Sequence, residues 1–112
     1  MMQIDIKKLI EIATAAGEVV MKIYQESDFD VKQKEDKSLL TKADLASHAL
    51  ISDALQKWYP AIPVISEESS HHYDYEIRRH WEYFFLVDPL DGTKEFIKRN
   101  GEFTINIALT KH

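Results

Sequence analysis

Apolar residues recur at helical spacing in two long stretches of the chain. Over residues 5–25 they fall every three or four positions and leave a polar opposite face: Ile6, Leu9, Ile10, Ala13, Ala16, Val20, Ile23 and Tyr24. This spacing predicts an amphipathic helix. Over residues 41–59 the apolar positions cover a wider arc, so we expect a second helix that packs against more than one neighbour. Thr41 and Asp44 have the spacing of a capping box at its start, and Pro60 follows its end.

Shorter stretches have the patterns of β-strands. Residues 29–34 and 103–109 alternate along the chain, whereas residues 63–66 and 83–87 are short and largely apolar. Residues 38–40 follow a polar turn, and we expect them to return beside the first of these strands.

The strand predicted over residues 83–87 runs directly into Asp88 and Pro89. Proline fixes φ and has no amide proton to donate to a sheet ladder. We therefore expect the strand to end at Asp88 and the chain to turn there.

Two carboxylates and a predicted helix start share the loop that follows. Asp88 and Asp91 lie three positions apart, and Gly92 and Thr93 open a short helix predicted over residues 94–98. Carboxylate oxygens bind hard divalent cations, and the first N–H groups of a helix bind phosphate. The loop is therefore a candidate site for a cation and a phosphate together. The alternative is an ordinary Asp-Gly turn in which Asp91 bonds to its own backbone.

Three more acidic residues are candidates for the same site. Glu67 and Glu68 follow the strand over residues 63–66, and adjacent side chains on an extended segment point to opposite sides. One of them can thus face a metal while the other supports it; the alternative is a solvated pair. Asp44 is a helix cap, and it is also placed to act as a general base that deprotonates a water molecule.

Other polar residues give weaker signals. Three histidines occupy a polar stretch with room for one helical turn: His71, His72 and His80. Their spacing fits no usual zinc signature, so we expect them to be exposed. Lys94, Lys98 and Arg99 either attract an anionic substrate or form the polar face of the short helix.

Composition narrows the function classes. The 112 residues are at most one domain, and the net charge of −5 argues against a nucleic-acid-binding face. The chain has no cysteine, which excludes disulfides and thiolate metal sites. No apolar run approaches the roughly 20 residues of a membrane span, and the first residues lack the pattern of a signal peptide. We expect a cytoplasmic protein.

Together these motifs resemble the inositol monophosphatase superfamily, whose members are Mg²⁺-dependent, lithium-sensitive phosphomonoesterases. The resemblance rests on D-P-L-D-G-T at residues 88–93, E-E after a P-V-I-S strand, and T-x-x-D at a helix start. Residues 95–104, E-F-I-K-R-N-G-E-F-T, narrow it to the bacterial 3′(2′),5′-bisphosphate nucleotidase branch. The absence of a D-x-D-G-T pattern favours metal-activated water over an aspartyl-phosphate.

The resemblance implies ligands for two or three Mg²⁺ ions. Glu67 resembles a ligand that also contacts the attacking water, and Asp88 resembles the carboxylate that bridges two ions. Leu90 would contribute its backbone carbonyl, and Asp91 resembles a ligand of the second ion. Glu68 matches the second glutamate of the motif without a defined role.

The resemblance also implies catalytic and substrate-binding residues. Asp44 and Thr93 resemble the pair that orients and deprotonates the attacking water beside Glu67. Gly92 and Thr93 would offer backbone N–H groups to the phosphate. Glu67 and Asp91 complete the expected substrate contacts.

The fold implied by the resemblance is α+β: a layered α/β sandwich whose N-terminal part packs two long helices on an antiparallel sheet. Nothing in the sequence matches the W-D-x-A-type motif of the family's second half. We therefore expect residues 1–112 to be the N-terminal part of a single phosphatase domain without its C-terminal half. The surface that this half would cover offers a site for self-association.

The implied reaction is hydrolysis of adenosine 3′,5′-bisphosphate to AMP and phosphate, in sulfur assimilation. The partner is thus a small nucleotide bisphosphate, with no nucleic acid and no transmembrane segment. The resemblance also allows peripheral association with the cytoplasmic face of the inner membrane. The alternatives are a phosphatase of inositol phosphate or fructose bisphosphate, or an inactive fragment that at most binds a cation or self-associates.

Overall fold

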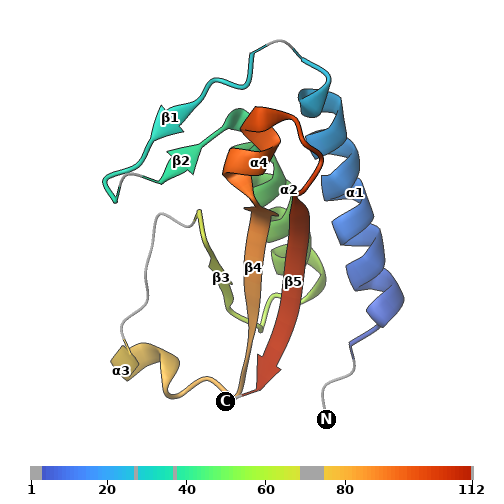
Figure 1. Cartoon of the computed structure of the whole chain (residues 1–112). Coiled ribbons are helices and arrows are strands. Elements are labelled where there is room, and N and C mark those ends of the chain that lie inside the picture. Colours follow the sequence, from blue (N-terminus) through green and yellow to red (C-terminus); the bar gives the residue numbers. More distant parts are fainter. Residues whose placement is uncertain (1–3, 27, 37, 69–74, 112) are drawn as a thin grey trace.

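The computed structural model describes residues 4–26, 28–36, 38–68 and 75–111, which form two long helices, two short ones and two small sheets (Figure 1). The helices are α1 Ile6–Tyr24, α2 Lys42–Trp58, α3 Tyr75–Arg78 and α4 Thr93–Lys98. The strands are β1 Lys32–Gln33, β2 Leu39–Leu40, β3 Val64–Ser66, β4 Tyr83–Asp91 and β5 Thr104–Lys111. No helix within the described ranges is long and apolar enough to cross a membrane.

The two long helices begin and end where the sequence predicts. Asp5 caps α1, because its side chain accepts a hydrogen bond from the amide of Lys7 at 2.9 Å. Thr41 and Asp44 form the predicted capping box of α2. The helix ends at Trp58, just ahead of Pro60. As expected from its wide apolar arc, α2 contacts α1, β3 and β4.

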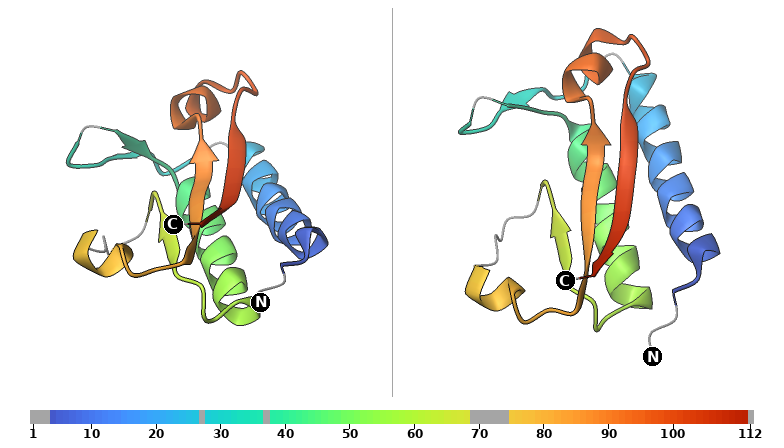
Figure 2. Two further views of the ribbon diagram at one scale, coloured as in Figure 1. Left: turned by 90° about the horizontal axis from the view of Figure 1, so that it is seen from below. Right: turned by 60° about the horizontal axis from the view of Figure 1, so that its bottom comes forward.

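Both long helices pack on one side of the three-stranded sheet β3–β4–β5, as Figures 1 and 2 show. The core between them is made of residues from each layer: Ile12, Ala16, Ile51, Leu55, Ile62, Phe85 and Val87. Side chains alternate across a strand, so Leu86, between two core residues, points to the other side and is 50% exposed. The predicted α+β class with two long helices on a sheet is thus confirmed.

One detail of the predicted sheet is wrong. β4 and β5 are antiparallel, but β3 and β4 are parallel, with Ser66 opposite Val87. The sheet is therefore mixed, because the connection through α3 returns the chain to the same end of the sheet before β4 begins. This arrangement places the carboxyl ends of β3 and β4 side by side.

The prediction that the strand ends at Asp88 is also wrong. β4 continues to Asp91 through an irregularity: Asp88 pairs with Asn106, and Asp91 pairs with Thr104. Two residues of β4 thus lie opposite one of β5, which is a β-bulge. Pro89 is tolerated in this bulge, because a bulge leaves backbone groups out of the ladder.

The first hairpin is shorter than predicted. β1 holds two residues, Lys32 and Gln33, of the six predicted over residues 29–34. It pairs antiparallel with β2, which confirms the returning strand. α3 supplies the single helical turn expected before β4.

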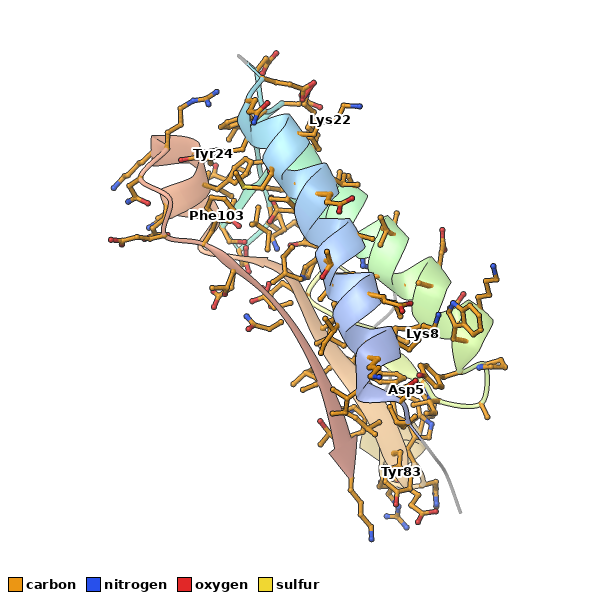
Figure 3. The ribbon with its side chains drawn as sticks, turned by 90° about the vertical axis from the view of Figure 1, so that its right-hand side faces the viewer. Asp5, Lys8, Lys22, Tyr24, Tyr83 and Phe103 are labelled. Atoms are coloured by element: carbon orange, nitrogen blue, oxygen red, sulfur yellow. The ribbon has the colours of Figure 1, made fainter. Side chains whose placement is uncertain are left out.

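An aromatic cluster holds α4 against the end of α1. Phe96 of α4 is fully buried, and its ring centroid lies 4.6 Å from that of Phe29 and 5.2 Å from that of Tyr24. Phe103, ahead of β5, lies 5.1 Å from Tyr24 in the same cluster (Figure 3). Arg99 closes the cluster, since its guanidinium lies 4.3 Å from the Phe29 centroid and donates to the Tyr24 carbonyl. These contacts therefore anchor α4 to the end of α1.

Candidate active site

The parallel pairing of β3 and β4 brings the two acidic motifs together. Ser66 is opposite Val87, so the next residues, Glu67 and Asp88, are neighbours at the same end of the sheet. The amide of Glu67 donates to the carbonyl of Val87 at 3.1 Å, which continues the pairing by one more bond. Motifs about twenty positions apart in sequence thus share one corner of the fold.

A hollow of about 210 Å³ lies at this corner. It is lined by the residues for which the family resemblance implies a role in binding metal or phosphate: Glu67, Asp88, Leu90, Asp91, Gly92 and Thr93. A wider groove of about 910 Å³ adjoins it and shares Lys34, Glu67, Glu68 and Asp88 with it. The candidate site is therefore concave and open to the outer face of the sheet.

The acidic residues of the hollow repel one another. Partial burial, followed by the negative charges of Asp91 and Glu67, raises the pKa of the Asp88 carboxyl above its ordinary value. The amide of Leu90 opposes this shift by donating a hydrogen bond to Asp88. A bound cation would relieve the repulsion, and carboxylate and carbonyl oxygens are the ligands that Mg²⁺ prefers. The donor set therefore fits a hard divalent cation in charge and in ligand type.

The side chains do not yet converge on one point. Within the described part of the chain, no group of three or more His, Asp or Glu side chains is close enough to hold a metal ion. The carboxylates of Glu67, Asp88 and Asp91 line one hollow, but they would have to rotate toward a common centre to bind the same ion. Their roles as ligands stay a prediction.

Behind the hollow, Asp44 is linked to Thr93. The Thr93 hydroxyl donates to Oδ1 of Asp44 at 2.9 Å, while Oδ2 accepts from the amide and hydroxyl of Thr41 at 2.8 and 2.6 Å. Asp44 is only 1% exposed, and every one of these bonds uses it as an acceptor. The Asp44–Thr93 pair predicted from the sequence is therefore formed, with Thr93 between Asp44 and the hollow.

The two adjacent glutamates have different environments, as the alternation of an extended segment predicts. Glu67 is exposed, whereas the carboxylate of Glu68 is 7% exposed and lies 3.1 Å from Nζ of Lys34. Burial on its own lowers the pKa of Lys34, but the hydrogen bond and charge of Glu68 outweigh it and raise that pKa. Glu68 is thus held by Lys34 while Glu67 is left to face the hollow.

Sequence reasoning missed Lys34, Ser47 and His48. Lys34 sits beyond a two-residue strand, where no pattern marks it as reaching a glutamate 34 positions away. Ser47 and His48 follow Asp44 at helical spacing, and they bond to Pro89 and Ser66 at the ends of the two strands. Their polarity on a buried helix face was the available signal.

Some predicted candidates lie elsewhere. His80 is exposed in a turn after α3, as expected, whereas His71 and His72 lie outside the described residues. Lys94 lines the hollow. Lys98 and Arg99 are exposed and do not line it, and Arg99 is bonded to the end of α1 instead.

Comparison with known proteins gives one consistent result. A sequence model of the inositol monophosphatase family matches residues 2–112. The 3′(2′),5′-bisphosphate nucleotidase CysQ of Shigella flexneri is 50% identical over 106 residues, which are 94% of this chain and 42% of that protein. The chain therefore spans about two fifths of the length of this relative.

Solved structures agree. The crystal structure of CysQ from Bacteroides thetaiotaomicron superposes with a TM-score of 0.75 at 48% identity, covering 94% of this chain and 37% of that one. The extragenic suppressor protein suhB from Bartonella henselae superposes with a TM-score of 0.82 at 27% identity, covering 95% and 40%. In both cases the match is to the N-terminal part of the fold.

Proposed function

The chain belongs to the inositol monophosphatase family, and on that premise we propose that its residues serve a Mg²⁺-dependent phosphomonoesterase. The proposed substrate is adenosine 3′,5′-bisphosphate, and the products are AMP and phosphate. In this proposal residues 1–112 are the N-terminal part of a single phosphatase domain. We also propose a cytoplasmic location, whereas peripheral association at the inner membrane rests on the family resemblance alone.

One observation carries the proposal. Glu67 follows β3 and Asp88 lies in β4, two parallel strands, so both carboxylates line the hollow that also holds Asp91. Partial burial and then the charges of the neighbouring carboxylates raise the pKa of Asp88, and a divalent cation would remove the repulsion between the carboxylates. Nothing in the core requires such a cluster, which makes a binding role the simplest account of it.

The chain's own residues have separable tasks in this reaction. Glu67, Asp88 and Asp91, with the carbonyl of Leu90, would hold Mg²⁺. The metal, when bound, supplies Lewis-acid chemistry that lowers the pKa of water and neutralises phosphate charge. Glu68, paired with Lys34, supports this set from the side.

Thr93 and Asp44 would handle the proton of the attacking water. Because the Thr93 hydroxyl already donates to Asp44, the lone pairs of its oxygen are left to accept a hydrogen bond from water in the hollow. As the water's proton passes to the Thr93 oxygen, the hydroxyl proton of Thr93 would pass to Oδ1 of Asp44. The other oxygen of Asp44 is held by the amide and hydroxyl of Thr41. The carboxylate is therefore fixed with Oδ1 toward Thr93, and protons would move from water to Thr93 and on to Asp44. Removal of the water's proton by this pair is general-base catalysis.

Gly92 would allow the phosphate to approach the backbone. Its φ of 94° lies in the left-handed region, and a Cβ here would meet the carbonyl oxygen of Glu102 at 2.8 Å. A glycine at this point lets the chain turn directly from β4 into α4. Gly92 and Thr93 both line the hollow, where their amides would bind the phosphate.

The substrate class rests on the relatives. The CysQ proteins that match at about 50% identity are named 3′(2′),5′-bisphosphate nucleotidases. The two alternative substrates are inositol phosphate and fructose bisphosphate, which other phosphatases of this fold class would take. The chain covers about two fifths of these relatives, and in this proposal the pocket for the rest of the substrate corresponds to the part of those relatives that the chain does not match.

A chimera tests the proposal. Residues 1–112 replace the matching segment of the Shigella flexneri nucleotidase, and phosphate release is measured with Mg²⁺ and each of the three substrates. We expect turnover of adenosine 3′,5′-bisphosphate, loss of it in the Asp88→Asn chimera, and inhibition by lithium. A folded chimera without turnover on any of the three would overturn the proposal.

The second candidate function is that the 112 residues alone bind a cation or self-associate without turnover. It is favoured by Leu86, which is 50% exposed on the side of the sheet away from α1 and α2. Sedimentation of the isolated chain, with and without Mg²⁺, measures association directly. Turnover by the isolated chain, abolished by Asp88→Asn, would count against this candidate.

A further inference from the structure

Two adjacent residues of α2 each bond to the end of a different strand of the site. The hydroxyl of Ser47 donates to the carbonyl of Pro89, in the bulge of β4, at 2.7 Å. Nδ1 of His48 lies 2.8 Å from Oγ of Ser66, the last residue of β3. Neither contact belongs to the apolar packing between α2 and the sheet. Both are directed at the strand ends that carry candidate ligands.

We infer that Ser47 and His48 are positioning residues that set the spacing of the metal ligands. Ser47 fixes the bulge between Asp88 and Asp91. His48 fixes the end of β3 immediately before Glu67. The inference deepens the proposed function and rests on it.

The contact of Ser47 is needed because the bulge lacks regular ladder bonds. Pro89 cannot donate, and the register of β4 against β5 shifts between Asp88 and Asp91. Ser47 and Pro89 are both fully buried, so the hydroxyl of Ser47 is a protein partner for a carbonyl remote from solvent. A bulge anchored in this way holds its two flanking carboxylates at a fixed separation.

The contact of His48 reaches the acidic pair through one serine. Ser66 is 2% exposed, and its hydroxyl oxygen accepts the amide of Glu68 at 3.4 Å. With the ring proton on Nε2, Nδ1 of His48 accepts a hydrogen bond from the hydroxyl of Ser66. The chain from His48 through Ser66 to the Glu68 amide therefore fixes the turn on which Glu67 lies.

Helical geometry explains why residues of one helix can hold the ends of both strands. Positions 44, 47 and 48 are three and four residues apart, so Asp44, Ser47 and His48 lie on one face of α2. Asp44 bonds to Thr93 at the start of α4. The first turns of α2 are thus a rigid template whose three polar groups hold the three segments around the hollow.

Residue-resolved hydrogen exchange of the metal-free chain tests the two anchors separately. Ser47→Ala is expected to speed exchange of the amides of Leu90 and Asp91 by about tenfold, as for loss of a hydrogen bond to a buried group. His48→Ala is expected to do the same for Glu67 and Glu68. Ser47→Ala should leave amide exchange at the end of β3 unchanged, and His48→Ala should leave it unchanged at the end of β4.

Matched variants separate positioning from general destabilisation. Ser52 lies one turn further along α2, and its hydroxyl is 3.4 Å from His48 Nδ1, so Ser52→Ala removes a hydroxyl bonded within the helix. Ser52→Ala should leave amide exchange unchanged at the ends of both strands. Ser66→Ala breaks the His48 contact from the strand side and should reproduce the pattern of His48→Ala. Uniformly faster exchange in all variants, or no change at either end, would overturn the inference.

Metal affinity gives the second readout. Titration of the folded chain with Mn²⁺, in place of Mg²⁺, should show about 10- to 100-fold weaker binding in Ser47→Ala and His48→Ala, the range for loss of a group that orients metal ligands. His48→Asn should restore most of the affinity, because its Oδ1 can take the place of Nδ1. Unchanged affinity in both alanine variants would overturn the inference. If the unaltered chain binds no Mn²⁺, the proposed metal site fails on this chain, and the exchange pattern alone decides the positioning roles.

Discussion

The hydroxyl of Thr93, at the start of α4, donates to the buried carboxylate of Asp44, at the start of α2, over 2.9 Å. The two residues are 49 positions apart, and each lies in the first turn of its own helix. Asp44 completes the capping box of α2 with one oxygen and holds Thr93 with the other. One side chain thus ties local helix formation to the geometry of the candidate site.

Loss of the Thr93 hydroxyl should abolish catalysis with little effect on the fold. In the chimera, Thr93→Val is expected to lower kcat by about 100- to 10,000-fold, the usual contribution of a positioned proton acceptor, with KM nearly unchanged. Steady-state kinetics on adenosine 3′,5′-bisphosphate measures both. Thr14→Val, at an exposed position of α1, is the control and should keep full activity. A Thr93→Val chimera with more than a tenth of the activity would contradict the assigned role.

Neutralising Asp44 should instead destabilise the chain. Asp44→Asn replaces one acceptor oxygen with an NH₂ group that faces either the donors of Thr41 or that of Thr93. We expect a loss of about 1–3 kcal/mol in the free energy of unfolding, because a cap and a buried acceptor are both impaired. Urea denaturation gives the value. Asp53→Asn, exposed on the same helix, should cost less than about 0.5 kcal/mol.

The raised pKa of Asp88 predicts a stability change with pH in the absence of divalent cations. Burial and the neighbouring charges of Asp91 and Glu67 raise the pKa of the Asp88 carboxyl above its ordinary value of 3.8, so the folded chain binds this proton more tightly than the unfolded chain. Stability attributable to this group is therefore present below that value and is lost as pH rises through the folded pKa. The Asp88→Asn variant cannot ionise at this position and does not lose this stability. Its free energy of unfolding relative to that of the unaltered chain should therefore increase with pH and then level off.

Asp36 provides a control of opposite sign. A hydrogen bond from the Ser38 side chain, then one from its amide, lowers the pKa of Asp36. Its contribution is present above the unfolded pKa and is lost as pH falls through the folded one. The free energy of unfolding of the Asp88→Asn and Asp36→Asn variants is measured in EDTA from acid to neutral pH. The difference between each variant and the unaltered chain, plotted against pH, should have opposite slopes for the two variants. Parallel slopes would show that folding does not raise the pKa of the Asp88 carboxyl.

Local patterns predicted the helices well because their signals are local. Asp5, Thr41 and Pro60 mark helix ends through contacts within a few positions, and the apolar stripes between them determine which face is buried. The motif residues Glu67 and Asp88 were also recognisable, since each follows a short apolar strand. Local patterns could not predict that these two strands pair in parallel, because this pairing depends on the path of the connection between them.

The remaining errors have the same origin. Pro89 has the signal of a strand end, but tertiary contacts, including the bond from Ser47, carry β4 onward through a bulge. Lys34 has no local signal at all, because its partner Glu68 lies in the turn that follows β3, a strand of the other sheet. Which residues bond across layers depends on the tertiary structure, so these contacts cannot be predicted from the neighbouring residues in the sequence.

Gly92 should be the least replaceable of the three glycines. Its φ of 94° costs a residue with a Cβ about 1–2 kcal/mol, and that Cβ would lie 2.8 Å from the Glu102 carbonyl oxygen, inside van der Waals contact. We therefore expect Gly92→Ala to lower the free energy of unfolding by at least about 2 kcal/mol. It should also weaken Mn²⁺ binding, because β4 and α4 can no longer join at the same angle.

The two other glycines separate backbone strain from overlap. Gly101 has a φ of 77° but nothing within 4 Å of an added Cβ, so Gly101→Ala should cost only the strain, about 1 kcal/mol. Gly17 lies inside α1 with the same open space, so Gly17→Ala should stabilise the chain by about 0.5–1 kcal/mol. Urea unfolding of the three variants should therefore rank them Gly17→Ala, Gly101→Ala, Gly92→Ala from most to least stable. A Gly92→Ala variant as stable as Gly101→Ala would mean that the turn into α4 can relax, and that the close approach to Glu102 does not fix the corner of the site.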